Sequence, residues 1–246
     1  MKILVCISST PDTTSKISFK NNDTEFNTDG IQYILNPYDE WYALVKALEI
    51  KEKSGGSVTV IHVGPVNNEP MIRKALAIGA DDAVRINHTP ISSYDTALQI
   101  GYYASGKGYD LILTGKETID YQSAEVGAMI AELLDLPFVP FASQLECDAS
   151  VARCNRDIEG GIEILEITLP AVISASKGMA EQRIANMKGI MMAKSKPLIV
   201  EAPIPVDSLI AIEGYTLPPA KKGVKMLDVD HLDELVRLLH EYDKVI

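Results

Sequence analysis

The sequence predicts an α/β fold: a doubly wound, mainly parallel sheet with an added antiparallel hairpin and an extended C-terminal arm that ends in a helix. Short, wholly apolar runs alternate with segments of helical periodicity as far as about residue 138, as expected for parallel strands buried on both faces. Alternating apolar residues then follow around a Gly-Gly turn, and from about residue 201 prolines punctuate the chain. We therefore divide the chain into an α/β domain, residues 1–200, and an arm, residues 201–246.

Each regular element of the α/β domain follows from a local pattern. The expected strands are continuous apolar runs at residues 2–7, 57–63, 82–86, 111–113 and 169–173. The expected helices repeat apolar residues three and four apart, at residues 37–54, 67–78, 97–105 and 126–133. Asn36 is a suitable N-cap for the first of these helices, and Pro37 suits its first position.

The remaining segments depart from this rhythm. Residues 11–35 are polar and turn-rich, and they suggest a small hairpin off the main sheet. Residues 144–156 and 161–168 form the expected antiparallel hairpin. In the arm, a helix of about twelve residues with Asp230 as its cap is marginal alone in water, so its apolar stripe must be covered by this chain or by another.

Composition limits the possible functions. The chain has 246 residues, 46% of them hydrophobic and 23% charged, which is typical of a globular protein. Its net charge of −11 argues against a nucleic-acid partner, because phosphate neutralisation needs clustered Lys and Arg. No apolar run approaches the roughly 18–20 residues of a membrane helix, so we expect no direct membrane insertion. Three cysteines without metal-like spacing fit free thiols, a cytoplasmic location and no metal site.

The most informative stretch joins a buried strand to a helix start. The apolar run at residues 111–113 ends at Thr114-Gly115, a polar loop follows, and helical periodicity resumes at Val126. Backbone N–H groups at a helix N-terminus are unsatisfied and partly positive, and Gly127 has no Cβ to keep an anion away. This stretch favours a nucleotide phosphate site, with an ordinary strand–helix turn as the alternative.

Other parts of the chain are expected at the same edge of the sheet. In an open parallel sheet, ligands bind beyond the carboxyl ends of the strands, where the strand order reverses. Cys6 and Val63 end two other strands, and their small apolar side chains suit an adenine or ribose. The segment Asn36–Asp39 supplies a second helix start. The convergence of these features favours nucleotide binding over any single motif.

No arrangement of catalytic side chains accompanies this expected site. Gly115-Lys116 is not a P-loop, because Asp110 and Glu117 stand where that motif needs Gly and Ser or Thr. The four histidines are scattered, and no nucleophile has a recognisable partner base. Asp120 and Glu125 flank the loop, where single acidic residues are more often caps or solvated groups than bases. The chain is therefore expected to bind a ligand rather than to catalyse a reaction.

Several motifs closely resemble the signature of the electron transfer flavoprotein beta (small) subunit. They are Met1–Ile7, Asn36-Pro37, Arg73–Asp81, Thr114–Lys116, Ile119-Asp120, Arg156–Gly161, Leu169–Val172, Glu181–Arg183 and Ile190–Lys194. The resemblance covers essentially the whole chain. It implies a heterodimer with an alpha subunit, which carries most of the FAD site and on which the arm packs. It also implies electron flow from dehydrogenases, notably acyl-CoA dehydrogenases, to an electron transfer flavoprotein-quinone oxidoreductase and the quinone pool.

The resemblance further implies that this subunit holds a structural AMP without a redox role and has no catalytic residues of its own. The implied nucleotide-binding residues are Cys6, Asn36, Pro37, Tyr38, Asp39, Val63, Gly115, Lys116, Glu117, Thr118, Ile119, Asp120, Tyr121, Gln122, Ser123, Ala124, Glu125, Val126 and Gly127. Tyr38 occupies the aromatic position expected near the flavin of the partner subunit.

Residues 182–194 resemble the family's recognition loop, which docks dehydrogenases through an exposed apolar side chain. The expected docking residues are Arg183, Met187, Lys188, Ile190 and Met191. Met187 stands where many members have Leu, and Met is a flexible contact residue suited to several partners. A solvated loop with an incidental Met is the alternative.

Departures from the family pattern leave the identity of the nucleotide open. Many AMP-binding members carry Gln-Thr-Gly where this chain has Glu125-Val126-Gly127, and Glu125 would repel a phosphate unless it points outward. Some relatives bind a second FAD in place of AMP and bifurcate electrons from NADH, which is the alternative function. A third class is a stand-alone adenine-nucleotide sensor of the stress-protein kind.

Gln182 stands where Pro is usual, so a less rigid docking loop is expected.

Overall fold

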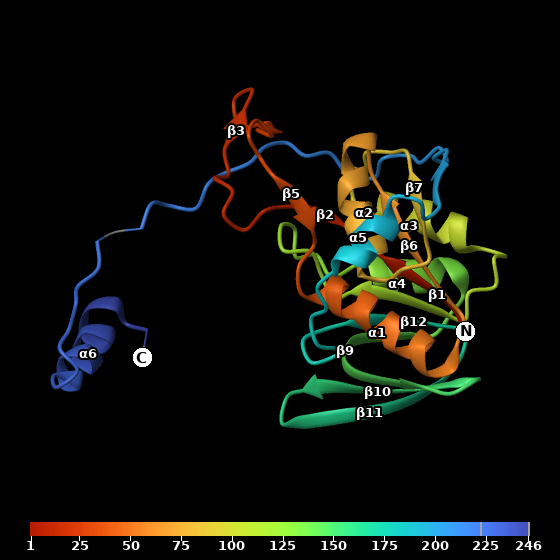
Figure 1. The fold of residues 1–246 in the computed structure, drawn as a ribbon. Helices are drawn as coiled ribbons and strands as arrows, with labels where there is room; N and C mark the ends of the chain where they lie inside the picture. The colour runs from red at the N-terminus through yellow and green to blue at the C-terminus, as the bar shows by residue number, and fades with distance from the viewer. Residues whose placement is uncertain (222, 246) are drawn as a thin grey trace. The chain divides into compact units, whose positions relative to one another are not determined.

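The computed structural model describes residues 1–221 and 223–245, and these build a nine-stranded sheet (Figure 1). Its strands are β1 (Lys2–Cys6), β6 (Ser57–Val63), β7 (Asp82–Ile86), β8 (Leu111–Gly115), β9 (Phe138–Cys147), β10 (Val151–Ile158), β11 (Gly161–Thr168), β12 (Ala171–Ala175) and β13 (Leu198–Glu201). The order across the sheet is β11-β10-β9-β12-β8-β1-β6-β7-β13. From β9 to β13 the neighbouring strands are parallel, and β10 and β11 extend the sheet in antiparallel fashion.

The strand order reverses beside β1, which confirms the prediction of a doubly wound, mainly parallel sheet. The chain runs outward from β1 to β6 and β7, and then returns to β8, which pairs with the opposite side of β1. The carboxyl ends of β1 and β8 therefore flank the topological switch point, which is where open α/β sheets bind ligands.

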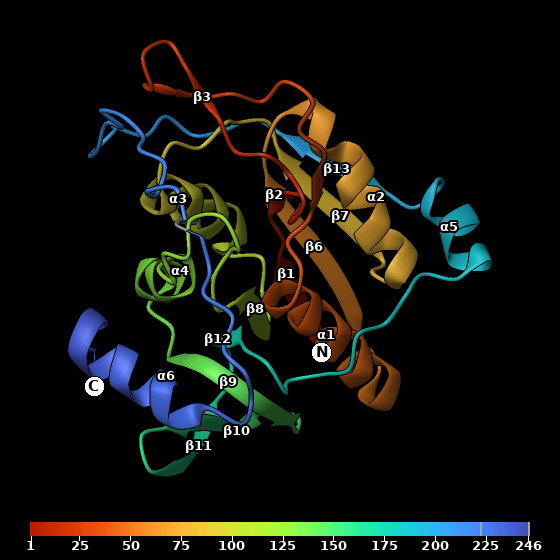
Figure 2. The same cartoon turned by 90° about the vertical axis from the view of Figure 1, so that its left-hand side faces the viewer.

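Helices cover both faces of the sheet (Figure 2). They are α1 (Asp39–Ser54), α2 (Glu69–Ile78), α3 (Ser93–Ala104), α4 (Val126–Leu134) and the short α5 (Met187–Ala193), with a 3-10 turn η1 (Val66–Asn68) before α2. Because side chains alternate along a strand, Ile3 and Val5 of β1 join the core under α1 and α2, whereas Leu4 and Cys6 join the core under α3 and α4. No helix among the described residues has the length and apolar character needed to span a membrane.

Two parts of the sheet differ from the sequence-based expectation. The segment expected as one strand at residues 144–156 is two strands, β9 and β10, separated by the turn at residues 148–150. β9 also begins earlier than expected, at Phe138. Pro140 and Phe141 fit into the strand because the pairing of β9 with β12 shifts register near them, and Phe141 takes a φ of 57°. β13 is an addition that the sequence pattern does not predict. It pairs with β7 and extends the parallel part of the sheet by one edge strand.

Two short antiparallel pairs lie outside the main sheet, as expected for residues 11–35. β2 (Ser9–Pro11) pairs with β5 (Tyr33–Leu35), and β3 (Phe19–Lys20) pairs with β4 (Glu25–Phe26). By their contacts, residues 1–17 and 28–213 form one unit, whereas residues 18–27 group with residues 214–246. The functional division expected at residue 200 stays a prediction.

The second unit is held by a few specific contacts and ends in a short helix. Phe19 stacks on Tyr215 with ring centroids 4.8 Å apart, and Tyr215 N–H donates to the carbonyl of Asp23. α6 (Leu232–Leu238) continues as a π-helical turn, η2 (Leu239–Asp243). The expectation that Asp230 caps this helix is wrong, because His231 holds the N-cap position and its side chain makes no capping bond.

Candidate functional site

The start of α1 packs directly against the two strand ends at the switch point. The Ser8 N–H donates to Glu40 Oε2 at 2.5 Å, and Glu40 is buried although it lies in the first turn of the helix. A Cβ on Gly115 would lie 2.7 Å from Glu40 Cγ and 2.9 Å from the Glu40 backbone nitrogen. Gly115 is therefore required by close approach, and it lets β1, β8 and α1 meet at one point.

Asn36 forms hydrogen bonds that hold the loop after β8 beside the start of α1. Its Nδ2 donates to the carbonyl of Glu117 at 3.1 Å, and its Oδ1 accepts from the N–H of Ile119 at 3.1 Å. Its own N–H donates to the carbonyl of Ser8. The prediction that Asn36 caps the helix and that Pro37 begins it is wrong: α1 begins at Asp39, because the Asn36 amide is used by the loop.

The carboxyl groups at the start of α1 are unusual for surface acids. Burial raises the pKa of Glu40 to about 8, with smaller contributions from the charges of Asp120 and Asp39. Burial also raises the pKa of Asp39, while the nearby Lys116 opposes that change. The pKa of the Cys6 thiol is raised by burial and by Glu40, so Cys6 is a neutral, unreactive thiol.

The opposite side of the switch point presents a hydroxyl and a helix start. Thr114 Oγ1 is buried and has no hydrogen-bond partner among the described residues. A Cβ on Gly127, in the first turn of α4, would lie 2.7 Å from this oxygen and 3.1 Å from the Phe138 ring. The N-cap residue of α4, Glu125, is exposed, and its side chain makes no capping bond. The first N–H groups of α4 therefore have no side-chain acceptor from the cap position, and they lie beside a hydroxyl that also lacks a partner.

Three residues other than Gly have positive φ around this point. Tyr38, which precedes α1, has a φ of 68°, and Gln122 and Ala124 in the loop before α4 have φ values of 52° and 55°. Positive φ is uncommon for residues other than Gly and gathers at ligand sites. The loop is also tied to the start of α3, because Ser123 Oγ and Ser93 Oγ lie 3.0 Å apart. Tyr38 itself is 60% exposed.

The structure brings most of the predicted nucleotide-binding residues to the switch-point crevice, which we define as the carboxyl ends of β1 and β8 with the starts of α1 and α4. Cys6 and Val63 are buried in the core on the α3 and α4 side, at the ends of β1 and β6. The predicted binding set omits Ser8, Glu40 and Thr114, although Thr114 stands in the stretch that favours a phosphate site. The alternation along β8 was the available signal for Thr114, since it shares a face with Ile112 and faces α4.

The predicted docking residues lie away from this crevice, on a segment that is anchored to α1 and α2. Arg183 does not project freely: its guanidinium forms two bonds to Glu52, at 2.6 and 3.0 Å, and its carbonyl accepts from Trp41 Nε1. At the other end, Arg73 donates to the carbonyls of Ala193 and Lys196. Arg183 therefore anchors the segment, whatever further contact it makes.

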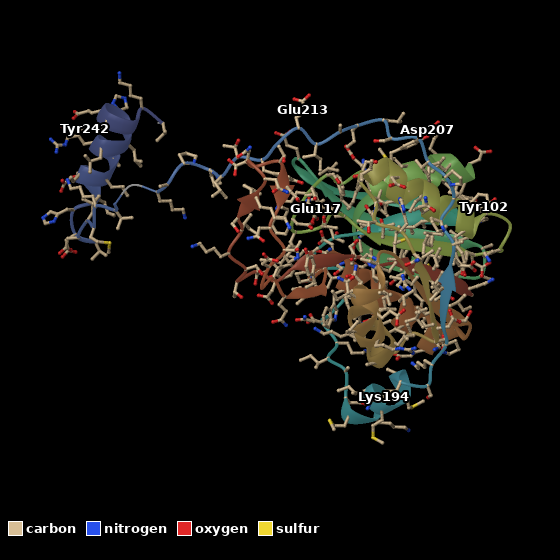
Figure 3. The ribbon with its side chains drawn as sticks, turned by 90° about the horizontal axis from the view of Figure 1, so that it is seen from above. Tyr102, Glu117, Lys194, Asp207, Glu213 and Tyr242 are labelled. Carbon is tan, nitrogen blue, oxygen red and sulfur yellow. The ribbon has the colours of Figure 1, made fainter. Side chains whose placement is uncertain are left out.

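The helix of this segment packs its backbone against α2 and presents its side chains outward. A Cβ on Gly189 would lie 2.3 Å from the carbonyl oxygen of Ala77, so only glycine permits this approach. Asn186 Oδ1 accepts from the N–H of Gly189 and caps the helix. Met187 and Met191 are 75% and 70% exposed. Figure 3 shows this segment extending outward around Lys194, with sulfur atoms on its outer side.

The fold thus defines a doubly wound α/β protein in which strand ends and helix starts meet at the switch point, with a separate, anchored helix that exposes apolar side chains. The family model described as "Electron transfer flavoprotein domain" matches residues 23–205. The chain is similar to the electron transfer flavoprotein subunit beta of Bacillus subtilis, with 37% identity over 262 residues and 100% of both chains covered. The human subunit of the same name is 32% identical, with 100% of this chain and 99% of that protein covered.

A further relative is the caffeyl-CoA reductase-Etf complex subunit CarD of Acetobacterium woodii, which is 33% identical over 81% of this chain and 78% of its own length. The family match and the full-length relatives agree. The chain belongs to the electron transfer flavoprotein family, on the beta-subunit side, and its role lies in electron transfer.

Proposed function

We propose that this chain is the small subunit of a heterodimeric electron transfer flavoprotein, and that it binds a structural AMP in the switch-point crevice. In this proposal an alpha subunit holds most of the FAD site, and the arm, residues 201–246, packs on that subunit. The complex accepts electrons from dehydrogenases such as acyl-CoA dehydrogenases and passes them through an electron transfer flavoprotein-quinone oxidoreductase to the quinone pool. The chain carries and positions cofactors in the cytoplasm and has no catalytic residues of its own.

The observation that carries the nucleotide proposal is the buried Thr114 hydroxyl, which has no partner among the described residues. A buried hydroxyl left without a hydrogen bond is costly, and a phosphate oxygen would relieve that cost. The uncapped start of α4 adds N–H donors and the positive end of the helix dipole at the same place. Gly127 permits the close approach, and the exposed Glu125 leaves the phosphate position free of its charge.

The remaining crevice residues have roles that fit a nucleoside. Cys6 and Val63, buried at the ends of neighbouring strands, would form the apolar layer beneath the adenine or ribose. Asn36 fixes residues 117–119 so that the loop keeps one shape. The exposed Tyr38 is free to meet a flavin held by the partner subunit. AMP supplies no redox chemistry here; it fills the crevice and holds the loop.

A second candidate is the beta subunit of an electron-bifurcating flavoprotein, with a second FAD in place of AMP and NADH as the donor. Two observations favour it. One relative is named as a subunit of a caffeyl-CoA reductase-Etf complex. The carboxylate of Glu125 also stands at the α4 N-cap, where many AMP-binding members have a neutral amide. Both candidates place adenylate phosphate at Thr114, so the flavin count of the complex distinguishes them.

Thr114→Val tests the phosphate position, because valine has nearly the same shape and lacks the hydroxyl. The native complex with its alpha subunit is purified, and its AMP or FAD content and its affinity for added AMP are measured. Loss of one hydrogen bond to a charged phosphate is expected to weaken AMP binding by about 1.5–3 kcal/mol, or roughly 10- to 100-fold.

Thr59→Val is the matched control. Thr59 is also buried, but it pairs with Leu4 of β1 and Asp82 of β7, away from the carboxyl ends of the strands. This variant should retain its nucleotide. If Thr114→Val keeps AMP at full occupancy with unchanged affinity, the hydroxyl is an unpaired core group and the placement of the phosphate is wrong.

A further inference from the structure

The outward face of α5 carries an unusual concentration of exposed sulfur. Met187, Met191 and Met192 are 75%, 70% and 50% exposed, and we call these three residues the methionine patch. Two other methionines of the chain, Met71 and Met179, are almost fully buried at 6% and 2%. Exposed thioethers thus gather on a helix of only seven residues.

Helix geometry explains why this face is outward and stays so. Successive residues turn by about 100°, so Met187 and Met191 lie about 200° from Gly189, on nearly the opposite side of the helix, whereas the half-exposed Met192 lies about 60° from Gly189 and flanks the packed side. Gly189 is pressed against the carbonyl of Ala77, and Ala193, one turn further on, is buried. The helix therefore cannot roll to hide its sulfur atoms without losing its packing on α2.

The anchoring is polar and independent of the methionine side chains. Lys196 Nζ donates to the carbonyls of Leu76 and Ala80 at the end of α2, and Arg73 donates to the carbonyls of Ala193 and Lys196. A chemical change at the patch would therefore alter the surface of the segment while leaving its attachment in place.

A thioether reacts with hydrogen peroxide in a two-electron oxidation. The sulfur lone pair attacks one peroxide oxygen, an S–O bond forms, the O–O bond breaks, and the second oxygen leaves as water after taking up a proton. The product, methionine sulfoxide, is polar and chiral, and sulfoxide reductases return it to the thioether. Leucine, which has a similar size and apolar character, has no such chemistry.

We propose that the methionine patch is a reversible peroxide-modification site, and that its oxidation weakens docking of the electron-donating dehydrogenase. The proposal rests on the expectation, from the family resemblance, that residues 182–194 dock the dehydrogenases of the proposed function, and it deepens that function. An apolar contact surface of Ile184, Ile190 and the methionine patch becomes polar at its centre when the sulfur atoms are oxidised, and a dehydrogenase must then bury sulfoxide oxygens that have no partner.

The test uses the purified heterodimer with its flavin and a butyryl-CoA dehydrogenase reduced by butyryl-CoA as electron donor. Limited hydrogen peroxide is added, sulfoxides are mapped by mass spectrometry, and the rate of flavin reduction is measured before and after treatment with methionine sulfoxide reductases A and B. We expect sulfoxide at the methionine patch before Met71 and Met179. We also expect a fall of about tenfold in the reduction rate, with recovery after the reductases act.

Substitutions show whether oxidation of the methionine patch is the cause of the slower flavin reduction. A Met187→Leu/Met191→Leu/Met192→Leu protein should be reduced at the untreated rate both before and after peroxide. Met226→Leu is the control, because it replaces a methionine of the arm, outside the docking segment. It should remain as sensitive to peroxide as the wild type.

Three outcomes would contradict the docking role of α5, the oxidation proposal or both, and each can be told apart from the others. If Met187→Gln/Met191→Gln/Met192→Gln leaves the untreated reduction rate unchanged, the docking role of α5 fails, and the oxidation proposal fails with it. If the glutamine variant is slow but fully oxidised wild type is not, only the oxidation proposal is overturned. If the triple leucine variant loses activity in peroxide to the same extent as wild type, the sensitivity lies elsewhere and the proposal is likewise overturned.

Discussion

Replacement of Glu40 by Gln tests the electrostatics of the switch-point crevice. Glu40 is 5% exposed, and its carboxyl accepts from the N–H of Ser8 while lying against Gly115. Its pKa is raised by burial from 4.5 to about 8, so the folded protein keeps this group protonated at pH 7 whereas the unfolded chain ionises it. A glutamine side chain at this position would keep the size and neutrality of the protonated acid without the capacity to titrate.

The sign and size of the effect follow from proton linkage. Between pH 4.5 and about 8 the folded state binds more protons at this position than the unfolded state, so stability falls as pH rises through that window. A difference from 4.5 to about 8, at 1.36 kcal/mol for each pH unit, corresponds to about 5 kcal/mol lost by pH 9. At pH 7 the loss is about 3 kcal/mol.

Equilibrium urea unfolding of the full-length chain at intervals from pH 5 to pH 9 measures this dependence. The stability of Glu40→Gln relative to wild type should rise with pH by about 4 kcal/mol between pH 5 and pH 9, and it should level off above pH 8. Asp39, whose pKa is also raised, is present in both proteins, so the comparison isolates the titration of Glu40 together with its coupling to Asp39. Glu132→Gln, at an exposed position of α4, is the control and should follow the wild type. Parallel stability curves for wild type and Glu40→Gln would refute the buried, protonated state of Glu40.

Two further substitutions address the crevice and the docking segment. Gly127→Val places a branched side chain where even a Cβ lies 2.7 Å from Thr114 Oγ1, so we expect AMP affinity to fall by at least about tenfold, measured by calorimetry on the complex. Full nucleotide occupancy in this variant would contradict the close approach. Met187→Ala should slow flavin reduction by an acyl-CoA dehydrogenase by about tenfold with flavin content unchanged, because an apolar contact is lost from the docking surface. Met226→Ala, which truncates an exposed methionine outside the docking segment, should be reduced at the wild-type rate, and equal rates for the two variants would remove the docking role.

Much of the sheet could be predicted because parallel strands buried on both faces leave a strong local pattern. The runs at residues 57–63 and 82–86 match β6 and β7 residue for residue. β13 could not be found in the same way, because its four residues stand between prolines and are half exposed at an edge. The turn between β9 and β10 carries Asp, Ala and Ser in place of a Gly or Pro signal, so the sequence pattern predicts one strand where the structure has two.

The switch point was predictable from the sequence, whereas the contacts made there were less so. The strand ends and the Gly115–Gly127 loop indicated the switch point, because βα topology alone brings such ends together. The role of Asn36 depended on which distant backbone groups needed partners, and those belong to residues 117–119, about eighty positions further along the chain. The burial of Glu40 is equally a tertiary effect: an acid in the first turn of a helix is normally a solvated group that complements the dipole.

The central claim is that the switch-point crevice of this subunit holds one adenylate without a redox role. The most direct measurement is to purify the native complex with its alpha subunit, release the bound molecules by denaturation, and quantify AMP and FAD against protein. The account predicts one AMP and one FAD for each heterodimer. Two FAD molecules and no AMP, or a complex that retains no nucleotide besides the flavin of the alpha subunit, would contradict it.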